Sequence, residues 1–134
     1  MPLLTILVRN MYTLFIDDER HPTPGLTKVL WAKDCDDVSR ILNEHGCPAV
    51  ISFDHDLGQF ADGRIKPNAM AALHELIGRH LDDDLDLNNV RRVIVHTQNP
   101  SGMRNLQGLW DGFSAAELQS GVKAEILPRT SITE

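Results

Sequence analysis

Carboxylates and histidines follow three apolar runs of the chain, each at the point where the run ends. The runs are 12–16, 49–53 and 93–95, and the polar residues after them are Asp17 and Asp18, then Asp54, His55 and Asp56, and finally His96, Thr97 and Asn99. Carboxylate oxygens suit hard divalent cations, and imidazole titrates near neutral pH and can transfer protons. If the runs are parallel strands of one sheet, these groups meet at its carboxyl edge, where open α/β sheets bind ligands.

The aspartates predict a divalent metal site. Carboxylates gathered at one sheet edge repel one another unless a cation or a shared proton offsets their charge. We therefore expect Asp17, Asp18 and Asp54 to hold Mg²⁺ or Mn²⁺, or its water. The alternative is that one or two of these acids only cap helices or loops. Two acidic clusters and histidines after three separate runs favour the functional interpretation.

His55 and His96 predict proton transfer. A pair of histidines at one edge can serve as general acid and general base, with Asp56 orienting one imidazole. The alternatives are that they ligate a metal or that they are interior histidines that only fix a loop. For either histidine alone, a chemical role and a purely structural role are equally favoured. Two histidines beside acidic residues favour the chemical role.

The remaining polar groups suggest phosphate binding. Arg20 can hold a phosphate through two parallel hydrogen bonds. Thr97 and Asn99 precede an expected helix, whose free backbone N–H groups attract anions, and Asn105 completes the polar set. For Asn99 the plainer alternative is helix capping.

The chain alternates expected strands with expected helices. Strands are predicted at 12–16, 29–32, 49–53, 90–95 and 122–127. Helices are predicted from Asp34 or Asp36 to Gly46, from Asn68 to about Leu81, and from 99–100 onward. In the second of these helices, the side chains expected to face the core are Met70, Leu73, Ile77 and Leu81. This alternation implies a doubly wound parallel sheet in the order 2-1-3-4-5. Two prolines and a glycine in 17–25 predict that the first crossover helix is shortened or lost.

Composition limits the classes of partner. The 134 residues suit a single domain, 1–134. A net charge of −6 argues against binding duplex DNA. Two cysteines without CxxC spacing favour a reducing, cytoplasmic compartment, and no apolar run is long enough to predict a membrane span. Residues 1–10 are either an N-terminal extension before Met11 or an edge strand, and the oligomeric state is open.

Three motifs together resemble one known family. The motifs are DDxRxP at 17–22, FDHDLG at 53–58 and H-T-x-N-P-x-G-x-x-N at 96–105. They are similar to those of the cyclic-phosphate-processing receiver domains of bacteria and phages, and the resemblance covers about residues 11–127. It implies a CheY-like (flavodoxin-like) α/β fold and a phosphoesterase-like site that acts on cyclic phosphates, such as cyclic nucleotides or 2′,3′-cyclic phosphate RNA ends.

The chain departs from the ordinary response-regulator receiver. The resemblance assigns Asp17 and Asp18 to the metal pair, Asp54 to the phosphoacceptor position and Thr97 to the region of the switch hydroxyl, but the lysine expected at the end of the fifth strand is missing. His55 and His96 are additions that a receiver does not need. These differences favour a cyclic-phosphate hydrolase. The alternatives are a binding module that sequesters a cyclic nucleotide or docks on a partner and, less favoured, a phosphoaccepting receiver.

Overall fold

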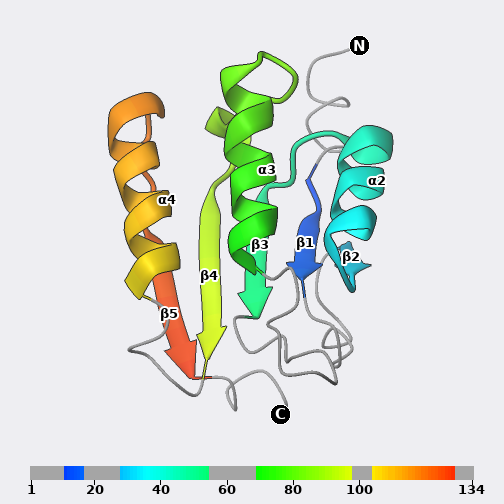
Figure 1. Cartoon of the computed structure of the whole chain (residues 1–134), viewed down its shortest axis with the longest axis horizontal. Coiled ribbons are helices and arrows are strands. Elements are labelled where there is room, and N and C mark those ends of the chain that lie inside the picture. Colours follow the sequence, from blue (N-terminus) through cyan, green and yellow to red (C-terminus); the bar gives the residue numbers. More distant parts are fainter. Residues whose placement is uncertain (1–10, 17–27, 55–68, 98–103, 129–134) are drawn as a thin grey trace.

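A computed structural model describes residues 11–16, 28–54, 69–97 and 104–128 (Figure 1). The elements are β1 (Thr13–Ile16), β2 (Val29–Ala32), α2 (Cys35–His45), β3 (Val50–Asp54), α3 (Ala69–Leu81), the short 3₁₀ helix η1 (Leu87–Asn89), β4 (Arg92–Thr97), α4 (Arg104–Glu117) and β5 (Ala124–Pro128). The predictions for the first crossover helix and for residues 1–10 fall outside the described residues.

The five strands form one parallel sheet in the order β2-β1-β3-β4-β5. This confirms the predicted CheY-like sheet, including the central position of β1, β3 and β4. The bounds differ from the prediction by one or two residues, as strand ends often do. The largest consequence is in β4, which begins at Arg92 and extends through His96 and Thr97. The third predicted run and the two polar residues directly after it, His96 and Thr97, therefore belong to one continuous strand.

Helix α2 begins and ends at the residues that its sequence indicates. The side chain of Asp34 accepts a hydrogen bond from the backbone N–H of Asp37, so Asp34 rather than Asp36 is the N-cap. Gly46 closes the helix with φ 78°, a conformation that suits glycine. The phenol of Tyr12 donates a hydrogen bond to the Gly46 carbonyl at 2.6 Å. The end of α2 is thereby tied to the entrance of β1.

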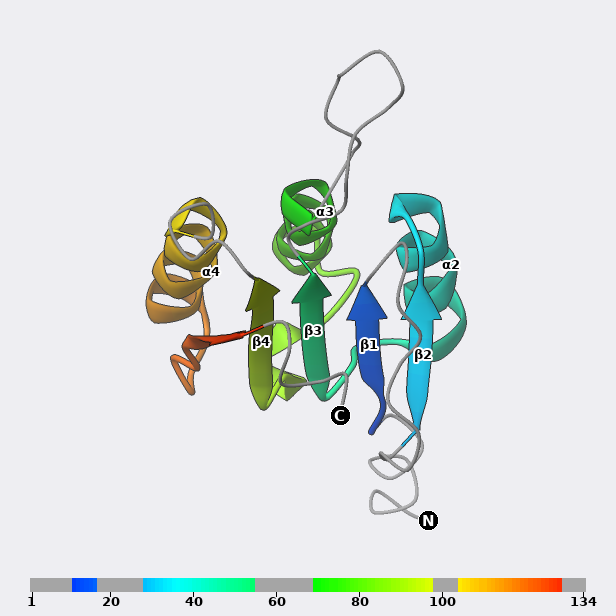
Figure 2. The same ribbon diagram turned by 90° about the horizontal axis from the view of Figure 1, so that it is seen from below.

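The three described α-helices, α2, α3 and α4, cover the same face of the sheet, as Figure 2 shows. The residues of this face include Leu14, Ile51 and Val93, which join buried side chains of the helices in one core cluster. Successive side chains of a strand alternate between faces. The opposite face, called the second face below, consists of Thr13, Phe15, Val29, Trp31, Val50, Ser52, Arg92, Ile94, His96, Glu125 and Leu127.

The packing of α3 corrects one prediction. The expected inward stripe was Met70, Leu73, Ile77 and Leu81. In the structure Leu73 and Leu76 are fully buried, and Met70 and Ile77 are partly buried against the core, whereas Leu81 is 59% exposed. The sequence of α3 carries two overlapping apolar stripes, and the helix turns the one with Leu76 toward the sheet. Leu81 lies in the last turn, beside the exposed turn at 82–84. None of the described helices combines the length and apolar character that crossing a bilayer requires.

Candidate functional site

Two of the predicted site residues are register partners at the carboxyl edge of the sheet. Strand β3 ends at Asp54, whose Cα pairs with that of His96 on β4. His96 in turn pairs with Leu127 on β5, and Thr97 pairs with Pro128. Neighbouring strands lie about 4.8 Å apart. Strands β3 and β4 therefore bring a residue of the second predicted cluster, Asp54, beside a residue of the third, His96, as a shared site requires.

His96 is buried, with 3% of its surface exposed. It belongs to the second face, and its nearest positions on that face are Asp54 on β3, Ile94 on its own strand and Leu127 on β5. It is not part of the core cluster beneath the helices. A histidine at a strand end, sheltered from bulk water and opposite a carboxylate-bearing position, has the setting expected of a proton-transfer group.

The other predicted ligands and acids lie mostly beyond the described ranges. Ile16, the last residue of β1, pairs with Phe53, and Asp17 follows Ile16 in the sequence. The predicted site residues outside the described part of the chain are Asp17, Asp18, Arg20, His55, Asp56 and Asn99. Within the described ranges no group of three metal-ligating side chains occurs. The metal site and the second histidine therefore remain predictions.

Asn105 belongs to the described start of α4, where its side chain is exposed. Helix α4 is anchored to β5 because Asp111 accepts a hydrogen bond from the backbone N–H of Ala124 at 2.8 Å. The indole N–H of Trp110 donates to the Val122 carbonyl at 2.9 Å. These contacts fix α4 beside the strand that flanks His96.

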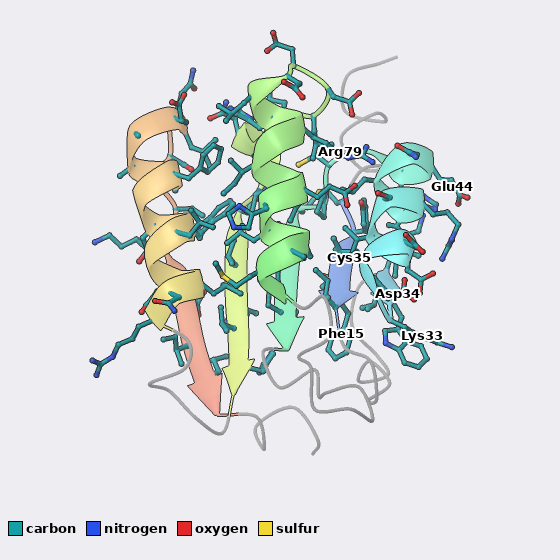
Figure 3. The ribbon with its side chains drawn as sticks, in the orientation of Figure 1. Phe15, Lys33, Asp34, Cys35, Glu44 and Arg79 are labelled. Carbon is teal, nitrogen blue, oxygen red and sulfur yellow. The ribbon has the colours of Figure 1, made fainter. Side chains whose placement is uncertain are left out.

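Lys33 is a candidate site residue that the sequence analysis missed. The row Ala32–Ile16–Phe53–Val95 runs across four strands, and Lys33 comes one position after it, as Asp54 and His96 do. Figure 3 shows Lys33 and Phe15 at the end of the sheet toward which the strands point. The ammonium nitrogen of Lys33 lies 4.9 Å from the ring centroid of Trp31. The sequence contains one indication of this role: Lys33 comes directly after a predicted strand, as Asp17 and Asp54 do.

The backbone at Lys33 is held by the start of α2. The N–H of Lys33 donates to a carboxylate oxygen of Asp37 at 3.0 Å. This hydrogen bond is the main reason that the pKa of Asp37 is lowered, since it stabilises the charged carboxylate. The α2 N-terminus thus fixes the backbone from which the lysine side chain extends.

A separate acidic hollow lies at the opposite edge of the sheet. It has a volume of about 510 Å³ and is lined by His80, Asp83, Asp84, Leu85, Asp86 and Asn88. The aspartates at 82–84 and 86 are exposed. His80 accepts a hydrogen bond from the backbone N–H of Leu87 at 3.0 Å, so it organises the turn into η1. This hollow is distinct from the carboxyl edge that carries Asp54 and His96.

Comparison with known proteins gives one match. A family model described as "Cyclic-phosphate processing Receiver domain" matches residues 12–112. The matched stretch includes Asp54, His96 and Lys33, and it is the same family that the three sequence motifs indicate. No curated protein and no solved structure matches the chain.

Proposed function

Because the chain belongs to the cyclic-phosphate processing receiver domain family, we propose that it is a phosphoesterase that opens cyclic phosphates. The proposed substrates are cyclic nucleotides or RNA ends that carry a 2′,3′-cyclic phosphate. The observation that supports this best is the register pair of Asp54 and His96 at the carboxyl ends of the two central strands. This is the edge at which parallel α/β sheets bind their ligands.

The proposed reaction is hydrolysis of one ester bond of the ring. Water attacks phosphorus, a new P–O bond forms, and the ring P–O bond breaks to give a phosphomonoester. One of His55 and His96 accepts the proton of the attacking water, and the other gives a proton to the leaving alkoxide. Asp56 is the proposed orienting group for a histidine. The leaving oxygen stays attached to the product, so water and the cyclic phosphate combine into a single phosphomonoester and no separate group departs.

The proposed metal ligands are Asp17, Asp18 and Asp54. Their donors are all carboxylate oxygens, which suit Mg²⁺ or Mn²⁺ rather than a thiolate-seeking metal. A bound divalent cation would supply charge neutralisation at the phosphate and a more acidic water. Arg20, Thr97, Asn99 and Asn105 are the proposed contacts to phosphate oxygens.

The test compares product formation by the wild-type protein and two variants. Asp54→Asn and His96→Gln keep the approximate size of each side chain while removing its charge or its proton transfer. His74→Gln is the matched control, because His74 is an exposed histidine on α3. Each protein is incubated with cyclic nucleotides and 2′,3′-cyclic phosphates, with Mg²⁺, Mn²⁺ or EDTA, and products are separated by chromatography.

We expect His96→Gln to lower kcat/KM by about 10²-fold or more, the usual contribution of a positioned acid or base. His74→Gln should retain wild-type activity, and circular dichroism should show all variants folded. Loss of activity with EDTA would support the metal ligands. Full activity in Asp54→Asn and His96→Gln would overturn the assignment. A cyclic nucleotide retained without any product would contradict hydrolysis and identify a binding module.

A further inference from the structure

Two aromatic residues lie side by side on the second face, next to the proposed catalytic edge. Phe15 on β1 and Trp31 on β2 are register partners, and Phe15 is also opposite Ser52 on β3. Phe15 is 6% exposed, and Trp31 is partly buried, with a minor part of its surface exposed. Trp31 thus presents aromatic surface at the outer strand, with Phe15 beside it toward the centre of the sheet.

A positive charge accompanies this aromatic pair. Lys33 is exposed, and its ammonium nitrogen lies 4.9 Å from the Trp31 ring centroid, within cation–π distance. It follows directly on the row Ala32–Ile16–Phe53–Val95, one position beyond it, as Asp54 and His96 do on β3 and β4. In a chain of net charge −6, this is a local cation at the edge where a phosphate is proposed to bind.

The spacing between Trp31 and Asp54 matches the reach of a nucleotide. Strands β2 and β3 are separated by β1, which gives about 9.6 Å across the sheet. Trp31 is level with Ser52, two residues before Asp54, which adds about 6.6 Å along the strand. The two Cα atoms are therefore roughly 12 Å apart by strand geometry. A phosphate at Asp54 and His96 leaves the attached base near Trp31.

We propose that Trp31 and Lys33 form the nucleoside subsite of this protein. Trp31 stacks on the base of a cyclic nucleotide or RNA end, and Lys33 adds positive charge between the base and the reacting phosphate. This inference rests on the proposed function and deepens it, because it makes cyclic phosphates that carry a nucleoside the preferred substrates. Base–aromatic stacking accepts any base, so the subsite distinguishes nucleosides from other groups rather than one base from another.

The test uses tryptophan fluorescence, which needs no turnover. The chain has two tryptophans, and Trp110 is 0% exposed. Quenching by a bound base therefore reports on Trp31. The probes are adenosine 2′,3′-cyclic phosphate and the base-free 1-O-methylribose 2′,3′-cyclic phosphate. The variants are Trp31→Leu and Lys33→Gln, and Lys28→Gln is the matched control, because Lys28 is exposed at the opposite end of β2.

We expect the adenosine probe to quench wild-type fluorescence and to bind more tightly than the base-free probe. By equilibrium dialysis, Trp31→Leu should raise Kd for the adenosine probe about tenfold, as loss of one stacking contact implies, and leave Kd for the base-free probe unchanged. Lys33→Gln should weaken adenosine-probe binding several-fold and reduce its salt dependence. Lys28→Gln should bind as the wild type does.

The outcomes separate the subsite from the proposed reaction. If the adenosine probe quenches Trp31 and depends on both side chains but yields no product, the subsite stands and hydrolysis is refuted. A second outcome is that the wild-type protein hydrolyses both probes with equal kcat/KM and that Trp31→Leu leaves both values unchanged. Hydrolysis then stands and the subsite is refuted. An equal rise in Kd for both probes in Trp31→Leu would also refute the subsite. The indole would then stabilise the structure of the carboxyl edge rather than bind a base.

Discussion

Replacing Ser114 with alanine should stabilise the protein. Ser114 lies on α4 with 0% exposure, and its hydroxyl has no hydrogen-bond partner among the described residues. A buried hydroxyl without such a bond costs about 1–3 kcal/mol in mutational data. Alanine also gains a few tenths of a kcal/mol in helix propensity. Removing one oxygen sacrifices packing worth less than about 0.8 kcal/mol, the value of a buried methylene.

The net expectation is that Ser114→Ala raises the free energy of unfolding by about 1 kcal/mol. In a domain of this size, that corresponds to an increase in Tm of about 3–4 °C. The measurement is urea unfolding followed by tryptophan fluorescence, with an unchanged m-value as the sign that only stability has changed.

Ser39→Ala is the matched comparison. Ser39 lies on α2, and its hydroxyl donates to the carboxylate of Glu75 on α3. Here alanine removes a hydrogen bond to a charged acceptor, so stability should fall by about 1 kcal/mol. Opposite signs for two serine-to-alanine changes in helices follow only if hydrogen bonding decides the outcome. A loss of 1 kcal/mol or more in Ser114→Ala would refute the reasoning, because it would mean that the hydroxyl is bonded.

Two further predictions concern the start of α2 and Cys47, two residues beyond its end. Asp34→Ala removes the N-cap hydrogen bond to the N–H of Asp37 and should cost about 1 kcal/mol in urea unfolding, whereas Asp36→Ala, with no such bond, should cost only a few tenths. Burial raises the pKa of the Cys47 thiol from 9.0 to about 12, so the folded state keeps a proton that the unfolded chain loses, and stability should fall as pH rises from 9.0 toward 12. Cys47→Ala should make this alkaline decline shallower in urea titrations, and an unchanged decline would contradict the prediction.

The order of the sheet could be predicted because the strands are short continuous apolar runs separated by prolines, glycines and helix caps. The residues at which each strand begins and ends could not be predicted from the apolar runs alone. The predicted strand 90–95 stopped before His96, whereas β4 continues through it, since polar residues at a strand end do not interrupt backbone pairing with β3 and β5. This extension is what pairs Asp54 with His96.

The rotation of α3 could not be predicted from period alone. Met70, Leu73, Ile77 and Leu81 follow a helical repeat, but so do Ala72, Leu73 and Leu76, and the two stripes differ by a fraction of a turn. The choice between them depends on contacts with distant strands and with α4.

The candidate site could be predicted where the residue type itself indicates metal binding or proton transfer, as with Asp54 and His96. Lys33 and Trp31 were overlooked because a lysine after an outer strand and a single tryptophan are ordinary surface features by themselves. Their significance comes from register, which pairs Trp31 with Phe15 and ends β2 one residue before Lys33, level with the residue before Asp54. Register is a tertiary property that a single strand's sequence does not contain.

The strand order also bears on how the chain folds as it is synthesised. The first described strand, β1, is an inner strand, and β2 and β3 later pair on either side of it. Strands β4 and β5 then add outward in sequence. The sheet can therefore grow from its inside as the chain emerges, since each new strand finds a finished neighbour. Until β5 is made, however, the nascent sheet presents β4 as an open edge, and β5, the last of the described strands, is the one that covers it.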